Sequence, residues 1–225
     1  MNWTPNKVTA VRVGVGFAAV SLFGKGPWEN LAAVGLTVAT IALDALDGHI
    51  ARKKNLATPM GAQLDILGDR MIENVYFTYF AVVGMVSLWI PVLFFVRGAA
   101  TDFLRGLAQR AGHAGWGSNG MLRKRWARAL VASRWSRGMY AAMKCLCFCY
   151  LGLELALTRG PVALLSGMTP NLHTMVRTGA MLLTSATAAF CVARGIPVLL
   201  EGWNYFAASV ANTQKTKRLA QGAAS

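Results

Sequence analysis

Charged residues are scarce in this chain, and acidic ones are the scarcest. Only 14% of the 225 residues are charged and just 9 are Asp or Glu, whereas 55% are hydrophobic. A soluble domain carries about a quarter charged residues, so this sequence has too few to cover a surface in water. The composition therefore argues against a soluble protein and predicts a membrane protein, whose helical spans each need about 20 mostly apolar residues.

Cysteine and histidine are also rare, with four and three copies. Cys145, Cys147 and Cys149 stand in an apolar run, and on a helix alternate residues point in different directions, so we expect packing rather than a metal cluster. No cleavage site of the A-x-A type follows a compact apolar core near the N-terminus, so we expect residues 8–24 to remain as a membrane helix. The sequence shows no internal repeat and predicts one membrane domain over residues 1–225.

Six apolar stretches predict an all-α fold with six membrane helices. They cover residues 8–24, 30–52, 62–87, 88–109, 133–157 and 176–202, with a tight turn at Pro91 and a cytoplasmic loop at 110–132 that holds a short amphipathic helix. The 23 Lys and Arg residues gather mainly after the second, fourth and sixth stretches. The positive-inside rule then places both termini in the cytoplasm, which suggests an integral protein of a bacterial cytoplasmic membrane. The same asymmetry accounts for much of the net charge of +14, and we predict no nucleic-acid partner.

Four carboxylates stand out against this apolar background. Asp44 and Asp47 are three residues apart near the end of the second stretch, and Asp65 and Asp69 are four apart at the start of the third. These spacings place each pair on one face of a helix, and the short connection makes the two helices antiparallel neighbours. The four carboxylates can therefore converge near the cytoplasmic surface, where divalent cations would offset their repulsion. Oxygen ligands favour Mg²⁺, Mn²⁺ or Ca²⁺ over zinc.

Two glycines and an arginine accompany the carboxylates. Gly48 lies one turn after Asp44 and Gly61 one turn before Asp65, where a missing side chain lets a ligand, or simply another helix, approach the backbone. Arg52 lies two turns beyond Asp44 on the same face, where it could meet a phosphate. The alternative is structural: the four aspartates would form intramembrane salt bridges with Arg52 and Arg70.

The whole segment resembles the signature of the CDP-alcohol phosphotransferase family. The matching pattern is Asp44-x2-Asp47-Gly48-x2-Ala51-Arg52-x8-Gly61-x3-Asp65-x3-Asp69, and the N-terminal TPNKVTAVR is similar to the start of phosphatidylglycerophosphate synthases. The resemblance implies a six-helix membrane fold, usually homodimeric, with a polar cavity that opens to the cytoplasm.

The resemblance also implies a donor and a set of site residues. The donor is CDP-diacylglycerol or a CDP-amino alcohol, whose pyrophosphate binds two divalent ions, Mg²⁺ or Mn²⁺. By matching position, the metal ligands are Asp44, Asp47 and Asp65. Asp69 matches the proposed general base and also contacts the second metal. The positions that line the nucleotide site are Gly48, Arg52 and Gly61.

Basic residues in the fourth and fifth apolar stretches suggest where an acceptor binds. An unpaired cation inside a membrane costs free energy. These side chains therefore either face the cavity or anchor the helices at the membrane surface. The candidates are Arg97, Arg105, Arg134, Arg137 and Lys144. They favour a phosphorylated polyol such as glycerol 3-phosphate, while inositol, inositol phosphate, serine and phosphatidylglycerol stay open.

A metal-ion membrane transporter is the alternative from a different functional class, because intramembrane carboxylates often mark ion pathways. The clustering of all four aspartates at one membrane face argues against it.

Overall fold

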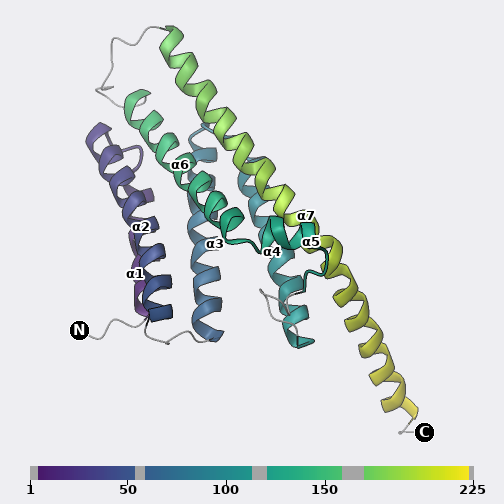
Figure 1. Cartoon of the computed structure of the whole chain (residues 1–225). Helices are drawn as coiled ribbons and strands as arrows, with labels where there is room; N and C mark the ends of the chain where they lie inside the picture. The colour runs from purple at the N-terminus through teal and green to yellow at the C-terminus, as the bar shows by residue number, and fades with distance from the viewer. Residues whose placement is uncertain (1–4, 54–58, 113–120, 159–169, 223–225) are drawn as a thin grey trace. The chain divides into compact units, whose positions relative to one another are not determined.

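Helices are the only regular secondary structure in the part of the chain that the computed structural model describes, residues 5–53, 59–112, 121–158 and 170–222. The helices are α1 (Pro5–Leu22), α2 (Pro27–Lys53), α3 (Pro59–Val82), α4 (Trp89–Arg110), α5 (Arg125–Val131), α6 (Arg134–Thr158) and α7 (Pro170–Gly222) (Figure 1). The all-α prediction is confirmed, and each predicted apolar stretch lies largely within one of the six long helices. The short α5 falls in the predicted loop at 110–132.

Proline and glycine set many of the helix ends. Four helices begin with proline, whose fixed φ suits the first helical position and whose missing N–H is not needed there: α1, α2, α3 and α7. Positive-φ glycines follow three helices, at Gly24, Gly84 and Gly112, and glycine adopts this left-handed conformation without steric cost.

One boundary prediction was wrong. The third span was expected to reach residue 87, but α3 ends at Val82 and Pro91 lies in the first turn of α4 rather than in the preceding turn.

Only two described stretches are long and apolar enough to cross a bilayer by themselves, Arg125–Thr158 and Asn171–Ser209. Their best windows have a mean hydropathy of 1.5 and 1.6. Ionisable residues lower the hydropathy of other long helices; α3, for example, contains Asp65, Asp69, Arg70 and Glu73. The six-span topology therefore stays a prediction.

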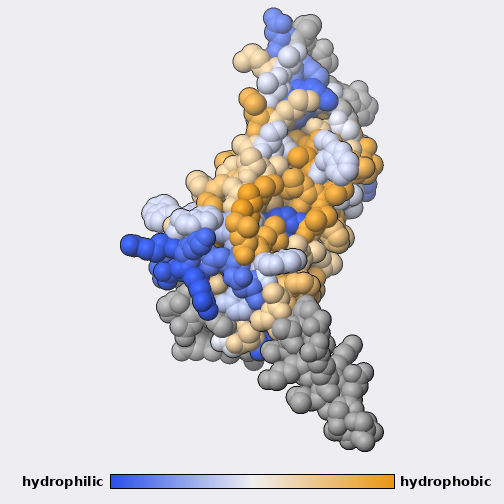
Figure 2. Space-filling view, turned by 90° about the vertical axis from the view of Figure 1, so that its right-hand side faces the viewer, coloured by the Kyte–Doolittle hydropathy of each residue, from blue (hydrophilic) through white to orange (hydrophobic). Residues whose placement is uncertain are grey.

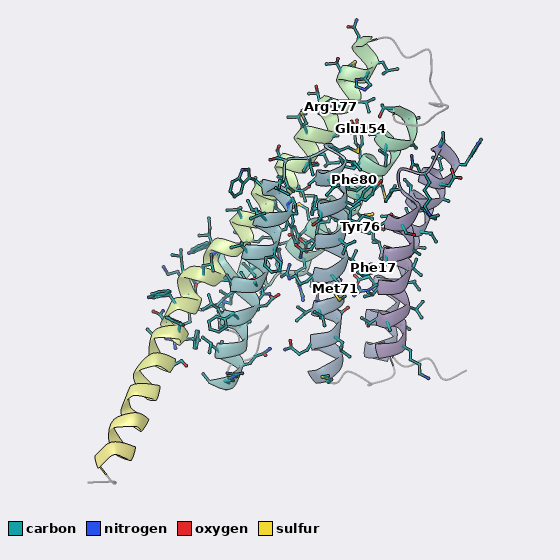
Figure 3. All side chains as sticks on the ribbon, turned by 180° about the vertical axis from the view of Figure 1, so that it is seen from behind. Phe17, Met71, Tyr76, Phe80, Glu154 and Arg177 are labelled. Atoms are coloured by element: carbon teal, nitrogen blue, oxygen red, sulfur yellow. The ribbon has the colours of Figure 1, made fainter. Side chains whose placement is uncertain are left out.

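The chain divides into two compact units, and the first comprises Met1–Phe95 and Ala141–Ala188. Within it, α1 packs against both α2 and α3. An aromatic cluster joins α3 to its neighbours: the Phe77 and Phe94 rings are 4.4 Å apart, and those of Tyr76 and Phe148 are 4.8 Å apart. Tyr76 also hydrogen-bonds Thr37 of α2 at 2.8 Å, and Figure 3 shows it one turn from Phe80 on α3. This core fixes the helix that carries two of the predicted aspartates.

The second unit comprises Val96–Tyr140 and Ala189–Ser225. At the ends of a helix, some backbone N–H and C=O groups lack hydrogen-bond partners within the helix. Side chains of α7 form hydrogen bonds with such groups at both ends of α5. Glu201 accepts hydrogen bonds from the backbone N–H groups of Arg123 and Lys124 just before α5. Arg194 donates to the carbonyl oxygens of Leu130 and Val131 at its end, at 3.0 and 3.2 Å. The apolar core beneath α5 consists of Leu104, Ala108, Met121, Leu122, Ala127, Val131 and Val198.

Large apolar side chains are exposed while several charged ones are buried. Trp28, Trp89 and Trp135 are 73%, 76% and 90% exposed, whereas Arg12 and Glu73 are 1% and 2% exposed. Figure 2 shows a wide hydrophobic area on one face of the molecule. Exposed apolar surface of this kind marks an interaction site or a lipid-facing surface.

Candidate functional site

Three of the four predicted aspartates come together in the first unit. Asp44 lies on α2, and Asp65 and Asp69 lie one turn apart on α3. One carboxylate oxygen from each lies within 4.8 Å of the others, and all three side chains are partly exposed. The helical spacing on α3 and the packing of α1 against both helices bring these residues to one place.

Arg12 of α1 lies at the centre of this carboxylate group. Its Nη1 is 3.0 Å from Asp69 Oδ1, its Nη2 is 2.9 Å from Asp65 Oδ1, and it also pairs with Asp44. The guanidinium is 1% exposed, so the water-facing side of the site belongs to the carboxylates. One buried cation therefore partly offsets three negative charges.

Sequence reasoning gave Arg12 no role, although it stands in the quoted segment TPNKVTAVR. The available signal was an arginine within an apolar stretch, which has to find a partner because an unpaired charge in a membrane is costly. The salt-bridge alternative named Arg52 and Arg70 as the partners. The structure shows Arg12 paired with three of the aspartates. The Nη1 atom of Arg70 is 3.2 Å from Oε2 of Glu73, and the side chain of Arg52 lies outside the described residues.

Gly68 permits the close approach of α1 and α3 at this point. A Cβ atom at Gly68 would lie 3.1 Å from Nη2 of Arg12 and 3.1 Å from a methyl carbon of Val13. Both distances are tight, so even an alanine here would require the side chain of Arg12 or Val13 to shift by a few tenths of an ångström. The glycine thus helps to hold the Arg12 guanidinium against the carboxylates.

A cavity of about 90 Å³ lies beside the carboxylate group. Asp44 and Asp69 line it, as do Glu73 and Lys144, so the space has acidic and basic parts. The other lining residues are Arg12, Thr37, Thr40, Ile41, Ile72, Tyr76, Ala141, Cys145 and Phe148. A small polar molecule in this cavity would contact a carboxylate that can accept a proton.

The donor set fits a divalent cation. Three carboxylate oxygens within 4.8 Å of one another are hard ligands of the kind that Mg²⁺ and Mn²⁺ prefer. A single guanidinium leaves negative charge to be neutralised. We therefore assign Asp44, Asp65 and Asp69 as the described residues that would hold a metal.

Four other predicted positions belong to the same motif. The side chains of Asp47 and Arg52 and the surroundings of Gly48 lie outside the described residues, although the backbone of all three belongs to α2. Gly61 lies in the first turn of α3, one turn before Asp65. Their roles at the metal and at the nucleotide stay predictions.

The five basic acceptor candidates have different surroundings in the structure. Lys144 lines the cavity, and its Nζ is 3.4 Å from Oε2 of Glu73. Arg105 pairs with Asp102 at 3.2 Å, and Arg97 lies over the ring of Tyr140 at 5.9 Å. The last two, Arg134 and Arg137, are exposed in the first turn of α6. Among the five, Lys144 alone is a lining residue of this cavity.

Arg194 is a second arginine that sequence reasoning missed. It is 4% exposed and lies over the ring of Tyr140 at 5.2 Å, in the second unit. Its hydrogen bonds to the end of α5 give it a structural role, because cations stabilise helix C-termini.

We expect Arg12→Met to destabilise the metal-free protein, but by less than the ~3–5 kcal/mol that breaking a fully buried ion pair costs, because the three carboxylates are 42–47% exposed. The substitution leaves three close carboxylates without their buried cation, so added Mn²⁺ should raise the melting temperature more in the variant than in the parent. Thermal unfolding in detergent, with and without Mn²⁺, measures both effects. Arg105→Met, which breaks a separate ion pair, is the control. Equal melting of the metal-free variant and parent would show that Arg12 does not hold the carboxylates.

Comparison with known proteins adds to this geometry. The family model for CDP-alcohol phosphatidyltransferases matches residues 2–132. A cardiolipin synthase (CMP-forming) from Oryza sativa subsp. japonica is 41% identical over 69 residues, 30% of this chain and 21% of the relative. A CDP-diacylglycerol–serine O-phosphatidyltransferase from Helicobacter pylori (strain J99) is 33% identical over 101 residues, 42% of each chain. The matches thus span less than half the length of these curated relatives.

A solved structure also resembles the chain. It is Mycobacterium tuberculosis phosphatidylinositol phosphate synthase (PgsA1) in complex with manganese and citrate, with a TM-score of 0.47 and 20% identity. The alignment covers 87% of this chain and 82% of that one.

Proposed function

This chain belongs to the CDP-alcohol phosphatidyltransferase family, and we propose that it transfers a phosphatidyl group from CDP-diacylglycerol to a hydroxyl of a small polar acceptor, with release of CMP, in phospholipid synthesis. The observation that carries this proposal is the convergence of Asp44, Asp65 and Asp69 beside a small cavity that is lined by both charged and apolar side chains. Glycerol 3-phosphate is the acceptor that we propose first. Serine is the second, because relatives from Helicobacter pylori are serine phosphatidyltransferases.

The described residues can take different roles in the reaction. Bound Mg²⁺ or Mn²⁺, with two ions proposed, would neutralise the donor pyrophosphate and the charge that develops on the leaving CMP. Asp69 lines the cavity and is the residue that we propose to take the proton from the acceptor hydroxyl. Arg12 orients Asp65 and Asp69 through contacts of 2.9 and 3.0 Å. Gly48, Arg52 and Gly61 are proposed to line the nucleotide end.

We place the protein in a membrane with six spanning helices, both termini in the cytoplasm, and a homodimer as its assembly. The exposed apolar side chains and the two long apolar stretches support a membrane location. The basic residues that follow the second, fourth and sixth predicted spans support the orientation.

The test uses the full chain purified in detergent with CDP-diacylglycerol, Mn²⁺ and a radiolabelled acceptor. Glycerol 3-phosphate, serine and inositol are supplied separately, and CMP release and lipid-bound label are both measured. We expect CMP release that depends on one acceptor and equals the label incorporated. Metal binding without CMP release from any acceptor would contradict the proposal and would favour the transporter alternative.

A further inference from the structure

The cavity continues past the carboxylate group to an ion pair between a buried glutamate and a partly exposed lysine. Glu73 lies one turn beyond Asp69 on α3 and is 2% exposed. Its Oε2 is 3.4 Å from Nζ of Lys144 on α6 and 3.2 Å from Nη1 of Arg70. Both Glu73 and Lys144 line the cavity together with Asp69. A molecule whose hydroxyl reaches Asp69 would therefore meet this pair with its remaining atoms.

The two basic partners of Glu73 differ in how they are attached. Arg70 is on the same helix, three residues away, so α3 itself keeps the two side chains within reach of each other. Lys144 comes from a different helix and carries its charge on a flexible four-carbon stem. Lys144 can therefore turn to another anion while Arg70 still balances Glu73. A buried pair of this kind is weak evidence for stability in itself, so a role toward a ligand is the stronger reading.

We propose that Lys144 binds the anionic group of the acceptor and that Glu73 is the resident anion which the acceptor displaces. This inference rests on the proposed transfer reaction and narrows its substrate class. The acceptor is a small hydroxy compound that carries a phosphate or a carboxylate. A cavity of about 90 Å³ has room for only a handful of water molecules, which suits such a headgroup.

Glu73 and Lys144 should then have opposite effects on the acceptor. Removing the lysine charge takes away a charge-assisted hydrogen bond, which is worth about tenfold to a hundredfold in affinity. Removing the glutamate charge takes away the competitor, so an anionic acceptor should bind more tightly. If the two residues only stabilised the fold, removing either charge would change the acceptor KM in the same direction.

The experiment compares Lys144→Met, Glu73→Gln and the double variant with the parent. Steady-state kinetics are measured with glycerol 3-phosphate, L-serine and uncharged glycerol as acceptors, and with CDP-diacylglycerol varied separately. We expect Lys144→Met to raise the acceptor KM by about tenfold to a hundredfold and to leave the donor KM unchanged. Glu73→Gln should lower the KM of the anionic acceptor. The acceptor whose KM responds identifies the anion as a phosphate or a carboxylate.

A double variant, a control variant and a binding measurement complete the test of the proposal. The double variant removes both charges of the Glu73–Lys144 pair and so leaves Glu73 without an uncompensated negative charge. It shows the loss of acceptor affinity even if Lys144→Met folds poorly. Lys25→Met, which removes an exposed cation outside the cavity, should match the parent. Thermal shifts with each acceptor report binding without turnover, so they decide the role of Lys144 even if the parent releases no CMP. A higher acceptor KM in both single variants, or a change confined to the donor KM, would overturn the proposal.

Discussion

Excess chelator is expected to abolish turnover, and added Mg²⁺ or Mn²⁺ to restore it. Carboxylate oxygens of Asp44, Asp65 and Asp69 lie within 4.8 Å of one another, and Arg12 supplies only one positive charge among them. The donor pyrophosphate would add further negative charge, which this site cannot stabilise without divalent ions. The measurement is CMP release across a titration of chelator, followed by readdition of each metal.

Arg12 should make the loss of turnover on chelation reversible, because it stabilises the metal-free carboxylates. Because its guanidinium contacts all three carboxylates in the metal-free protein, chelation should remove activity and leave the fold intact, with a melting temperature close to that before treatment. Chelator saturated with the same metal beforehand is the control for effects on detergent or lipid. Undiminished CMP release in excess chelator would refute the metal requirement.

The helical repeat was sufficient to predict which carboxylates share a face. Asp65 and Asp69 are four residues apart, and a short connection joins their helix to that of Asp44, so local geometry determines most of this arrangement. The same reasoning anticipated the all-α fold, because long apolar stretches separated by proline and glycine have few other outcomes. For Asp47 the expectation stays a prediction, since its side chain lies outside the described residues.

The partners of these residues could not be predicted in the same way. Arg12 is 53 positions from Asp65 in the sequence, and Lys144 is 71 positions from Glu73. Periodicity reveals the face on which a residue lies but not the neighbouring helix that the face meets. Glu73 went unnoticed for a related reason: it stands outside the motif, and its burial becomes evident only when α6 is packed nearby. Packing between distant segments therefore decides which cation serves which carboxylate.

Asp69→Asn is expected to lower turnover by at least about a hundredfold, the lower end of what a general base contributes. The amide keeps the shape of the side chain but cannot take the proton of the acceptor hydroxyl. Asp69 lines the cavity, and its Oδ1 atom is 3.0 Å from Nη1 of Arg12, so the group is already oriented where an acceptor would enter. The measurement is kcat with both substrates saturating. Asp102→Asn, which alters an ion pair with Arg105, should turn over like the parent.

Asp65→Asn separates the role of a base from that of a metal ligand. Asp65 belongs to the carboxylate group but not to the residues that line the cavity, so its amide variant should weaken metal binding without removing a proton acceptor. Raising the Mn²⁺ concentration should then restore much of the turnover of Asp65→Asn, because mass action refills a weakened site. Asp69→Asn should stay slow at every Mn²⁺ concentration, because metal cannot replace the missing base. If excess Mn²⁺ rescues both variants equally, Asp69 acts only as a ligand, and another group must accept the proton of the acceptor hydroxyl.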